Sequence, residues 1–237
     1  MTYEFDASEY EHEDDLISEP EQDDDMEEFW RDAGMPAAAT LRFAYQSSDG
    51  TSTERTLDVR EFAEGFSGPQ LRGHCHLRNT TRTFNVDRMS RCVDLQTGET
   101  VDDVAEHLFE LYKKTPEYSF DSIIENRIDT LRALIYLLDA GDLLQDRGAA
   151  ILGKVCRTLA RDQRITDAAV GEWLEQQDVP SLQAFRMIVG RINKGLGAQA
   201  KASIVNLASR IANLTGAPGA REQEALDYMV KRFAKSE

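Results

Sequence analysis

Alternating apolar and polar positions between residues 40 and 97 predict a series of short β-strands. The stretch "LRFAYQ" (41–46) places Leu41, Phe43 and Tyr45 on one face of a strand, and a turn-like "SSDG" follows it. Further strands are expected in "TERTLDV" (53–59), twice within 71–89, and in "RCVDL" (91–95). Several short strands in one segment predict a small β-barrel, closed or half-closed.

The spacing of apolar residues changes after Gly98 and predicts helices over the rest of the chain. The segment "TVDDVAEHLFELYKK" offers Thr100 as an N-cap and a stripe that includes Val104 and Leu108. Further helices are expected at 121–139, 147–161, 167–177, 181–194, 198–214 and 221–234. These seven helices predict an all-α domain at 100–237, so the fold class is expected to be α+β.

The formal net charge of −16 comes almost entirely from the first 36 residues. Residues 1–36 hold fifteen acids and one base, Arg31, whereas the remainder holds 28 acids and 26 bases. Large apolar residues such as Phe29 and Trp30 are interleaved with these acids. The segment is therefore expected to be an acidic, flexible tail, which either solubilises the chain or docks on a basic surface with apolar pockets.

The three cysteines, Cys75, Cys92 and Cys156, are an odd and scattered set, which predicts free thiols rather than disulfides or a zinc cluster. No basic segment followed by an apolar stretch opens the sequence, and no run of about eighteen apolar residues occurs. We therefore expect a cytoplasmic protein without membrane contact.

The segment "LRGHCHLRNTTRTFNVDRM" (71–89) contains four arginines, two histidines and no lysine. Strand alternation places Arg72, His74, His76 and Arg78 on one face, opposite the face of Leu71, Gly73, Cys75 and Leu77. A hairpin that closes Arg78 against Thr83 would bring both apolar sets to one core. That register would also set His74 across from Asp87 and Arg88 across from Gly73.

Three interpretations of this face stay open. His74, His76 and Asp87 have the composition of a two-histidine, one-carboxylate metal site, but the flanking arginines would repel a cation. Alternatively, His74 and Asp87 form only an exposed cross-strand pair. The third interpretation, which we favour, is a surface for phosphates and bases, because arginine without lysine suits bidentate phosphate contacts and stacking on bases.

The segments "LRFAY", "TERTLDVREF", "QLRGHCHLR" and "RTFNVDRM" together resemble a WYL domain, a small Sm/SH3-like barrel of bacterial regulators. The resemblance covers residues 40 to 95, although Pro69, Gln70 and Leu71 stand where that family has Trp-Tyr-Leu. It implies a basic pocket that senses a nucleotide or a short single-stranded nucleic acid. The residues implied in or near this pocket are Tyr45, Arg55, Arg72, His74, His76, Arg78, Arg82 and Arg88.

The helical half resembles, more weakly, the tellurite-resistance B-like (TerB-like) helical domain. The segment "LARDQRITDAAVGEWL" carries this resemblance; Asp162 matches a metal-binding acid, but Ala169 replaces a glutamate, so we expect no metal. In addition, no acid occurs between Asp178 and Glu222, while six cations do. These cations form either a second basic patch or ordinary helix faces.

No catalytic motif is recognisable, and alternation sends Cys75 to the face opposite His74 and His76, which disfavours a thiol–imidazole pair. The sequence therefore predicts a non-enzymatic regulatory or accessory protein without cofactor or metal. Its barrel is expected to sense a ligand, a nucleotide or single-stranded nucleic acid. The alternative is a protein-interaction adaptor that acts through residues 1–36, the acidic head, or through the helical domain, without a nucleic-acid ligand.

Overall fold

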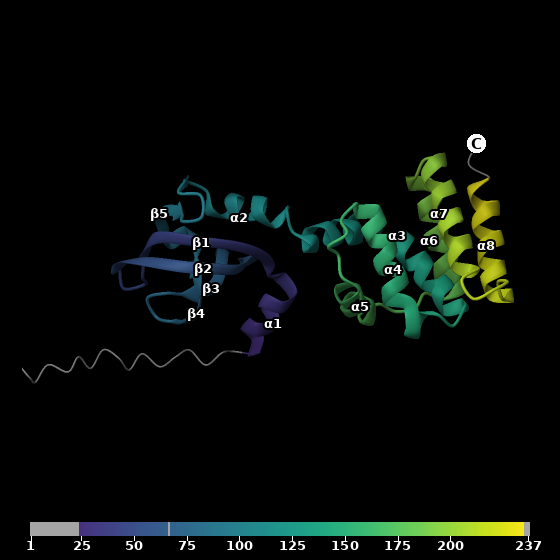
Figure 1. The fold of residues 1–237 in the computed structure, drawn as a ribbon, viewed down its shortest axis with the longest axis horizontal. Coiled ribbons are helices and arrows are strands. Elements are labelled where there is room, and N and C mark those ends of the chain that lie inside the picture. The colour runs from purple at the N-terminus through teal and green to yellow at the C-terminus, as the bar shows by residue number, and fades with distance from the viewer. Residues whose placement is uncertain (1–23, 66, 235–237) are drawn as a thin grey trace, which may run out of the picture. The chain divides into compact units, whose positions relative to one another are not determined.

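A computed structural model describes residues 24–65 and 67–234 of the chain (Figure 1). The chain divides into two compact units, one ending at Leu108 and the other starting at Phe109. The first contains an antiparallel sheet and the second is helical, which confirms the α+β class. Helix α2 (Val104–Tyr112) begins in the first unit and ends in the second. Residues 1–23, most of the expected tail, lie outside the described residues.

Six strands form the sheet, in the order β4-β3-β2-β1-β5-β6, and all neighbours are antiparallel. Their bounds are β1 (Met35–Gln46), β2 (Ser52–Gly65), β3 (Gly68–Cys75), β4 (Thr80–Asn85), β5 (Met89–Asp94) and β6 (Thr100–Val101). A short 3-10 turn, η2 (Val86–Arg88), links β4 to β5. The five expected strands are present, and the two-residue β6 is additional.

The expected N-cap at Thr100 is wrong, because Thr100 belongs to β6 and pairs with Val93. Helix α2 begins later, at Val104, and the side chain of Asp103 accepts the backbone N–H of Glu106 at 2.9 Å. Threonine satisfies both a strand and an N-cap, so the local sequence alone did not distinguish the two.

The sheet is rolled rather than flat. Strand pairing from β4 through β3 and β2 to β1 sets Phe84 level with Met35. The ring of Phe84 nevertheless lies 5.4 Å from that of Phe43 and 4.9 Å from that of Tyr45, eight and ten residues further along β1. Such a stagger between strands that are not paired with each other is what rolling a sheet toward a barrel produces. Within the described residues no backbone pairing joins β4 to β6, so the barrel is not closed.

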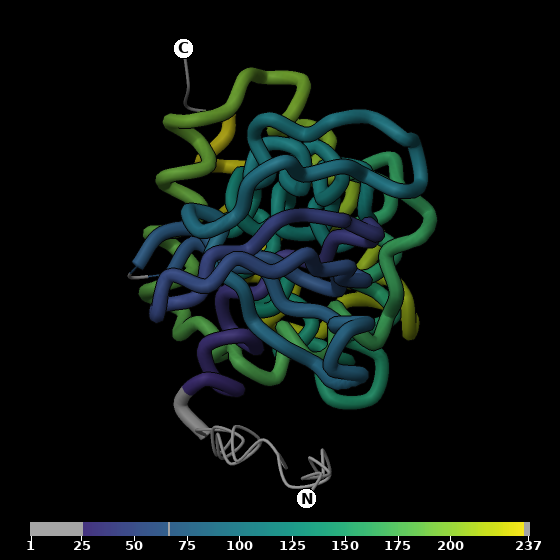
Figure 2. The backbone as a smooth tube through the Cα atoms, turned by 90° about the vertical axis from the view of Figure 1, so that its left-hand side faces the viewer, coloured from purple at the N-terminus to yellow at the C-terminus, as the bar shows by residue number. Residues whose placement is uncertain are grey.

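Helix α1 (Asp24–Ala33) lies beside the sheet, against β2 (Figures 1 and 2). Its Trp30 is 3% exposed and belongs to the core of the first unit. The backbone then turns sharply at Gly34, where a Cβ atom would lie 2.4 Å from the carbonyl oxygen of Trp30. The end of the acidic head is therefore a helix that packs on the sheet. The sequence predicted no regular structure for this segment.

The second unit is built around α3 (Pro116–Ala140), which packs against several other helices and is kinked at Arg127. The others are α4 (Leu144–Ala160), α5 (Asp167–Glu175), α6 (Leu182–Gly195), α7 (Ala198–Ala212) and α8 (Ala220–Phe233). Leu131, Leu134 and Leu138 are fully buried in α3, and Tyr136 stacks on Phe185 with ring centroids 4.4 Å apart. None of the described helices is both long enough and apolar enough to cross a membrane.

Candidate functional site

The β3–β4 hairpin has the predicted strand faces but a different register. Leu71, Gly73 and Cys75 are buried while Arg72 and His74 face the other way, as expected from alternation. The turn, however, spans residues 76–79, and Cys75 rather than Arg78 opens it, paired with Thr80. The shift is an even number of residues, so the faces are kept. It leaves Leu77 59% exposed and turns Arg78 and His76 from strand residues into turn residues.

The partner of Gly73 is Arg82, not Arg88. Strand β2, on the other side of β3, explains the glycine at position 73. A Cβ atom on residue 73 would lie 2.1 Å from the carbonyl oxygen of Asp58. The register of β2 and β3 shifts just beyond this point, between Val59 and Glu61. Glycine therefore permits a close backbone approach next to a bulge, instead of making room for an arginine side chain.

Arg72 is enclosed by acidic and aromatic side chains. Its guanidinium forms ion pairs with Glu61, at 3.3 Å, and with Glu27 of α1, and lies 5.9 Å from the ring centre of Trp30. Only 17% of its side chain is exposed. Burial raises the pKa of Glu61, although the nearby Arg72 opposes this shift. Arg72 thus joins α1 to the sheet. Among the residues of the expected pocket, it is the one whose charged group is most fully paired within the chain itself.

The two histidines are close together but do not meet Asp87. The rings of His74 and His76 lie 5.9 Å apart, and His76 Nε2 lies 2.8 Å from a carboxylate oxygen of Asp58. Asp58 also accepts the hydroxyl of Thr40, and its pKa is lowered, chiefly by the hydrogen bond with His76. Among the described residues no group of three metal-ligand side chains occurs. On this face, Arg72 and His76 therefore each have a carboxylate partner.

A second set of the expected residues lies on the opposite, inner face of the rolled sheet. Tyr45 is partly buried, with its ring edge-on to Phe84, and it is the cross-strand partner of Thr53. Arg55 follows on the same face, and its Nε donates to the Thr53 hydroxyl at 3.0 Å. Arg82 shares the face of Phe84 and is exposed. The structure thus separates Tyr45, Arg55 and Arg82 from Arg72, His74 and His76.

The arginines of the first unit differ in their partners. Residues 35–95 contain eight arginines and no lysine. Six of these are exposed, and none of the six side chains forms a hydrogen bond or ion pair with another described residue. They are Arg42, Arg60, Arg78, Arg82, Arg88 and Arg91. Three of these, Arg78 in the turn, Arg82 in β4 and Arg88 in η2, belong to the expected site and leave guanidinium groups free to bind anions.

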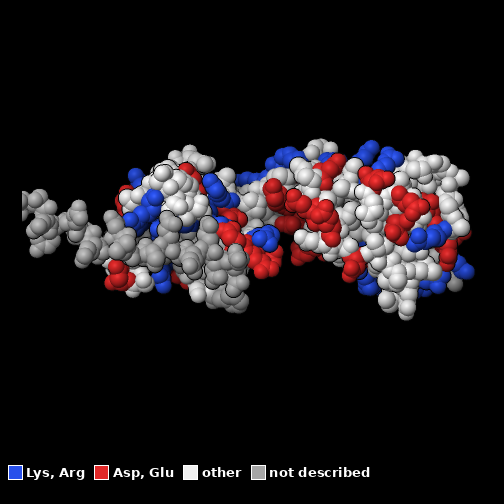
Figure 3. Space-filling model, turned by 90° about the horizontal axis from the view of Figure 1, so that it is seen from below, with Lys and Arg blue, Asp and Glu red and all other residues white. Residues whose placement is uncertain are grey.

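Three of the six cations in the acid-free stretch of the second unit pair with carboxylates of other helices. Arg186 pairs with Glu224, Arg191 with Asp129 and Arg221 with Asp139. Lys201 is buried, and its ammonium group lies near two oxygens of Asn193. Figure 3 accordingly shows acids and bases intermixed on the visible face of this unit. These contacts favour ordinary helix faces over a second basic patch.

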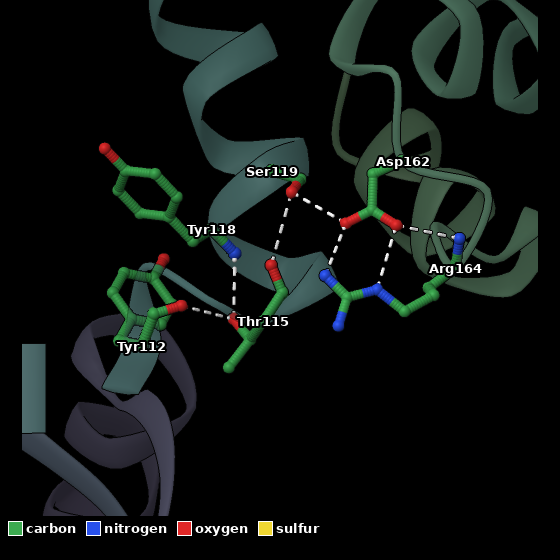
Figure 4. Close-up of polar contacts among 6 residues, drawn as sticks. All are labelled: Tyr112, Thr115, Tyr118, Ser119, Asp162 and Arg164. Atoms are coloured by element: carbon green, nitrogen blue, oxygen red, sulfur yellow. Dashed lines mark hydrogen bonds and ion pairs between the residues drawn. The ribbon is translucent and has the colours of Figure 1, made fainter. Parts of the chain in front are cut away.

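Asp162, the one acid that matched the TerB-like resemblance, is held by neighbouring side chains (Figure 4). Arg164 binds both of its carboxylate oxygens, at 3.0 and 2.8 Å, and Ser119 donates its hydroxyl at 2.8 Å. These hydrogen bonds, chiefly those from Arg164, hold the pKa of Asp162 well below its usual value of 3.8. Asp162 therefore ties the start of α3 to the α4–α5 connection.

Sequence reasoning missed three features of the first unit. Glu27 and Asp58 were not recognised as the partners of Arg72 and His76. Asp58 alternates with Leu57 and Val59, so its outward direction could have been found, but its strand neighbour depended on the unknown register. His107 was also overlooked: it lies 3.0 Å from the buried carboxylate of Asp94 and ties α2 to the sheet.

The comparisons with known proteins bear on the first unit. The family model described as the WYL domain matches residues 36–93, close to the range expected from the sequence. No curated protein and no solved structure matches the chain. The resemblance of the helical half to the TerB-like domain stays a prediction. WYL domains are commonly found in regulators that sense ligands or bind nucleic acids. Residues 36–93 of this chain are a WYL domain.

Proposed function

We propose that this chain is a non-enzymatic regulatory or accessory protein whose WYL domain binds a nucleotide or single-stranded nucleic acid. The observation that carries the proposal is the set of exposed arginines without acidic partners in a segment that has no lysine. Guanidinium groups bind phosphate oxygens in pairs and stack on bases, whereas an ordinary solvated surface would use both cations.

Within this proposal, the inner-face residues bind the ligand and the outer-face residues support the fold. Arg55 and Arg82 contact phosphate, Arg78 and Arg88 extend the cationic surface, and Tyr45 offers a ring edge or face beside Phe84 for a base. Arg72, His74 and His76 are assigned supporting roles, because Arg72 and His76 are bound by Glu27, Glu61 and Asp58, and His74 lies against His76.

Fluorescence anisotropy with a labelled single-stranded oligonucleotide tests this assignment. Arg55→Gln and Arg82→Gln should each weaken binding by roughly tenfold or more, because each removes a hydrogen bond between charged groups. Arg60→Gln, which removes an exposed arginine outside the proposed site, is the matched control and should leave affinity unchanged. Equal affinity in all three variants would contradict the site. An absence of any oligonucleotide or nucleotide binding would favour the adaptor function.

A further inference from the structure

A small pocket lies where strand β5 begins, strand β6 ends and helix α2 begins, and its lining residues all belong to the first unit. Its volume is about 220 Å³. At about 30 Å³ per water molecule, this is the space of roughly seven waters. This size suits a small metabolite.

The pocket separates two opposite charges that strand register would otherwise bring together. Cys92 pairs with Val101 and Val93 with Thr100, so the next antiparallel pair would be Arg91 with Asp102. Opposite charges at such positions ordinarily interact across the strands. Here the ladder stops, and neither side chain forms an ion pair or hydrogen bond with another described residue. Both residues line the pocket and both are exposed.

The backbone explains why this ion pair does not form. Arg91 has a φ of 52°, in the left-handed region that residues other than glycine rarely adopt. The pairing of β5 with β1 also shifts register here, between Arg42 and Ala44. A bulge of this kind redirects the chain and ends regular pairing. Non-glycine residues in such a conformation tend to occur at binding sites, where the surrounding structure holds them in place.

Four apolar side chains also line the pocket, Val86, Met89, Val101 and Val104, together with Ser90, Cys92 and Thr100. The lining thus presents the guanidinium of Arg91 and the carboxylate of Asp102, at neighbouring cross-strand positions, beside apolar side chains. Asp103 also lines the pocket, but its carboxylate accepts the N–H of Glu106 at the start of α2. Two carboxylates against one arginine disfavour a phosphorylated ligand.

We propose that this pocket binds a free α-amino acid with an aliphatic side chain. The carboxylate of the ligand pairs with Arg91, its ammonium group pairs with Asp102, and its side chain contacts the valines and Met89. The interrupted strand ladder leaves the charges of Arg91 and Asp102 unpaired. A zwitterion of this kind supplies a partner of opposite charge for each of them. None of the residues assigned above to contact with nucleic acid lines this pocket, so the two sites can be tested separately.

Isothermal titration calorimetry of the full chain with L-leucine tests the proposal. The matched probes are 4-methylpentanoate, which lacks the ammonium group, 3-methylbutylamine, which lacks the carboxylate, and adenosine monophosphate. Leucine should bind, and each truncated analogue should bind roughly tenfold to a hundredfold more weakly, because each loses one hydrogen bond between charged groups. Absence of leucine binding at millimolar concentration, or tighter binding of the nucleotide at this pocket, would overturn the proposal.

Variants locate the binding. Arg91→Gln and Asp102→Asn should each weaken leucine binding by a similar factor, whereas Arg60→Gln and Glu54→Gln, two exposed residues of β2 outside the pocket, should not. Arg91→Gly removes the guanidinium while suiting the left-handed backbone, so it should abolish binding without lowering the melting temperature. If leucine binds the Arg91 and Asp102 variants as tightly as the natural chain, the pocket is not the site.

Discussion

Arg72 shows how a residue expected to bind ligand becomes part of the fold. Its ion pairs with Glu27 and Glu61 and its position beside Trp30 fix α1 on the sheet. Removing one partner from a largely buried ion pair leaves the other charges unpaired, which costs more than the pair itself contributes. The charge of Arg72 therefore stabilises the fold, while the charges of Arg78 and Arg82 are available to a ligand.

Substitution of Arg72 should accordingly destabilise the first unit. Arg72→Ala is expected to lower its free energy of unfolding by about 1 to 3 kcal/mol. Arg78→Ala, in the exposed turn, should change it by less than about 0.5 kcal/mol. Denaturant unfolding measured through tryptophan fluorescence, with Trp173 changed to phenylalanine in both variants, would follow the change at Trp30. Equal stability of the two variants would show that Arg72 does not anchor α1.

Asp162 provides a pH-dependent contribution to stability in the second unit. Because its pKa is lowered in the folded state, mainly by Arg164, the contribution is present above the unfolded pKa of about 4 and is lost as pH falls below it. The melting temperature of Asp162→Asn should lie below that of the natural chain at pH 6, and the difference should shrink between about pH 4 and pH 2. A difference independent of pH over this range would show that the charge of Asp162 is not responsible.

At the scale of elements, the rolled sheet depends on contacts between strands that are not paired. Phe84 of β4 is 5% exposed and packs edge-on against Phe43 and Tyr45 of β1. Phe84→Ala should destabilise the first unit by about 3 to 5 kcal/mol, because it removes a buried ring and leaves a cavity. Phe84→Leu should recover much of that loss if apolar volume is what matters. Thermal unfolding of the three proteins gives the comparison, and a loss below about 1 kcal/mol would show that the sheet does not depend on this contact.

The sequence predicted elements better than it predicted their pairing. All seven helices of the region after residue 100 follow from apolar spacing, and β3 has the faces expected from alternation. The hairpin register could not be predicted, because any even shift keeps the same faces inward. The structure resolves the ambiguity with the turn at 76–79, where Asn79 adopts a φ of 51° that asparagine tolerates.

The candidate site was less predictable than the fold. The eight expected residues were grouped because their strands are close in sequence, but the sheet places Tyr45, Arg55 and Arg82 on one face and Arg72 and His74 on the other. Alternation gives the faces within one strand only. Bulges, such as that between Val59 and Glu61, decide which residues of neighbouring strands lie on the same face of the sheet. These bulges leave no clear sequence pattern.

At the scale of the whole molecule, the acidic head should weaken binding of any anionic ligand. Residues 1–23 contain ten acids and no lysine or arginine, so their removal changes the formal net charge from −16 to −6. A chain starting at residue 24 should bind a single-stranded oligonucleotide roughly threefold to tenfold more tightly at low salt, since a tethered anionic segment acts at a local concentration on the order of millimolar. The truncation must keep α1, because Trp30 belongs to the core.

A control separates docking of the head from bulk charge. Tyr3, Phe5 and Tyr10 can be changed to serine in the full chain, which keeps every acid. If these aromatic residues dock the head, the variant should bind the oligonucleotide nearly as tightly as the truncated chain. Affinity equal to that of the natural chain would show that charge alone is responsible, and an unchanged affinity of the truncated chain would contradict both explanations.

The central claim, that arginines of the WYL domain contact phosphates, is tested most directly by the salt dependence of oligonucleotide binding. Each phosphate contact on a single strand contributes about −0.7 to the slope of log affinity against log salt concentration. If Arg55, Arg82 and Arg88 each contact one phosphate, the slope should be about −2, and it should approach zero when all three are changed to glutamine. A slope that is the same in the natural chain and in this folded triple variant would contradict the claim.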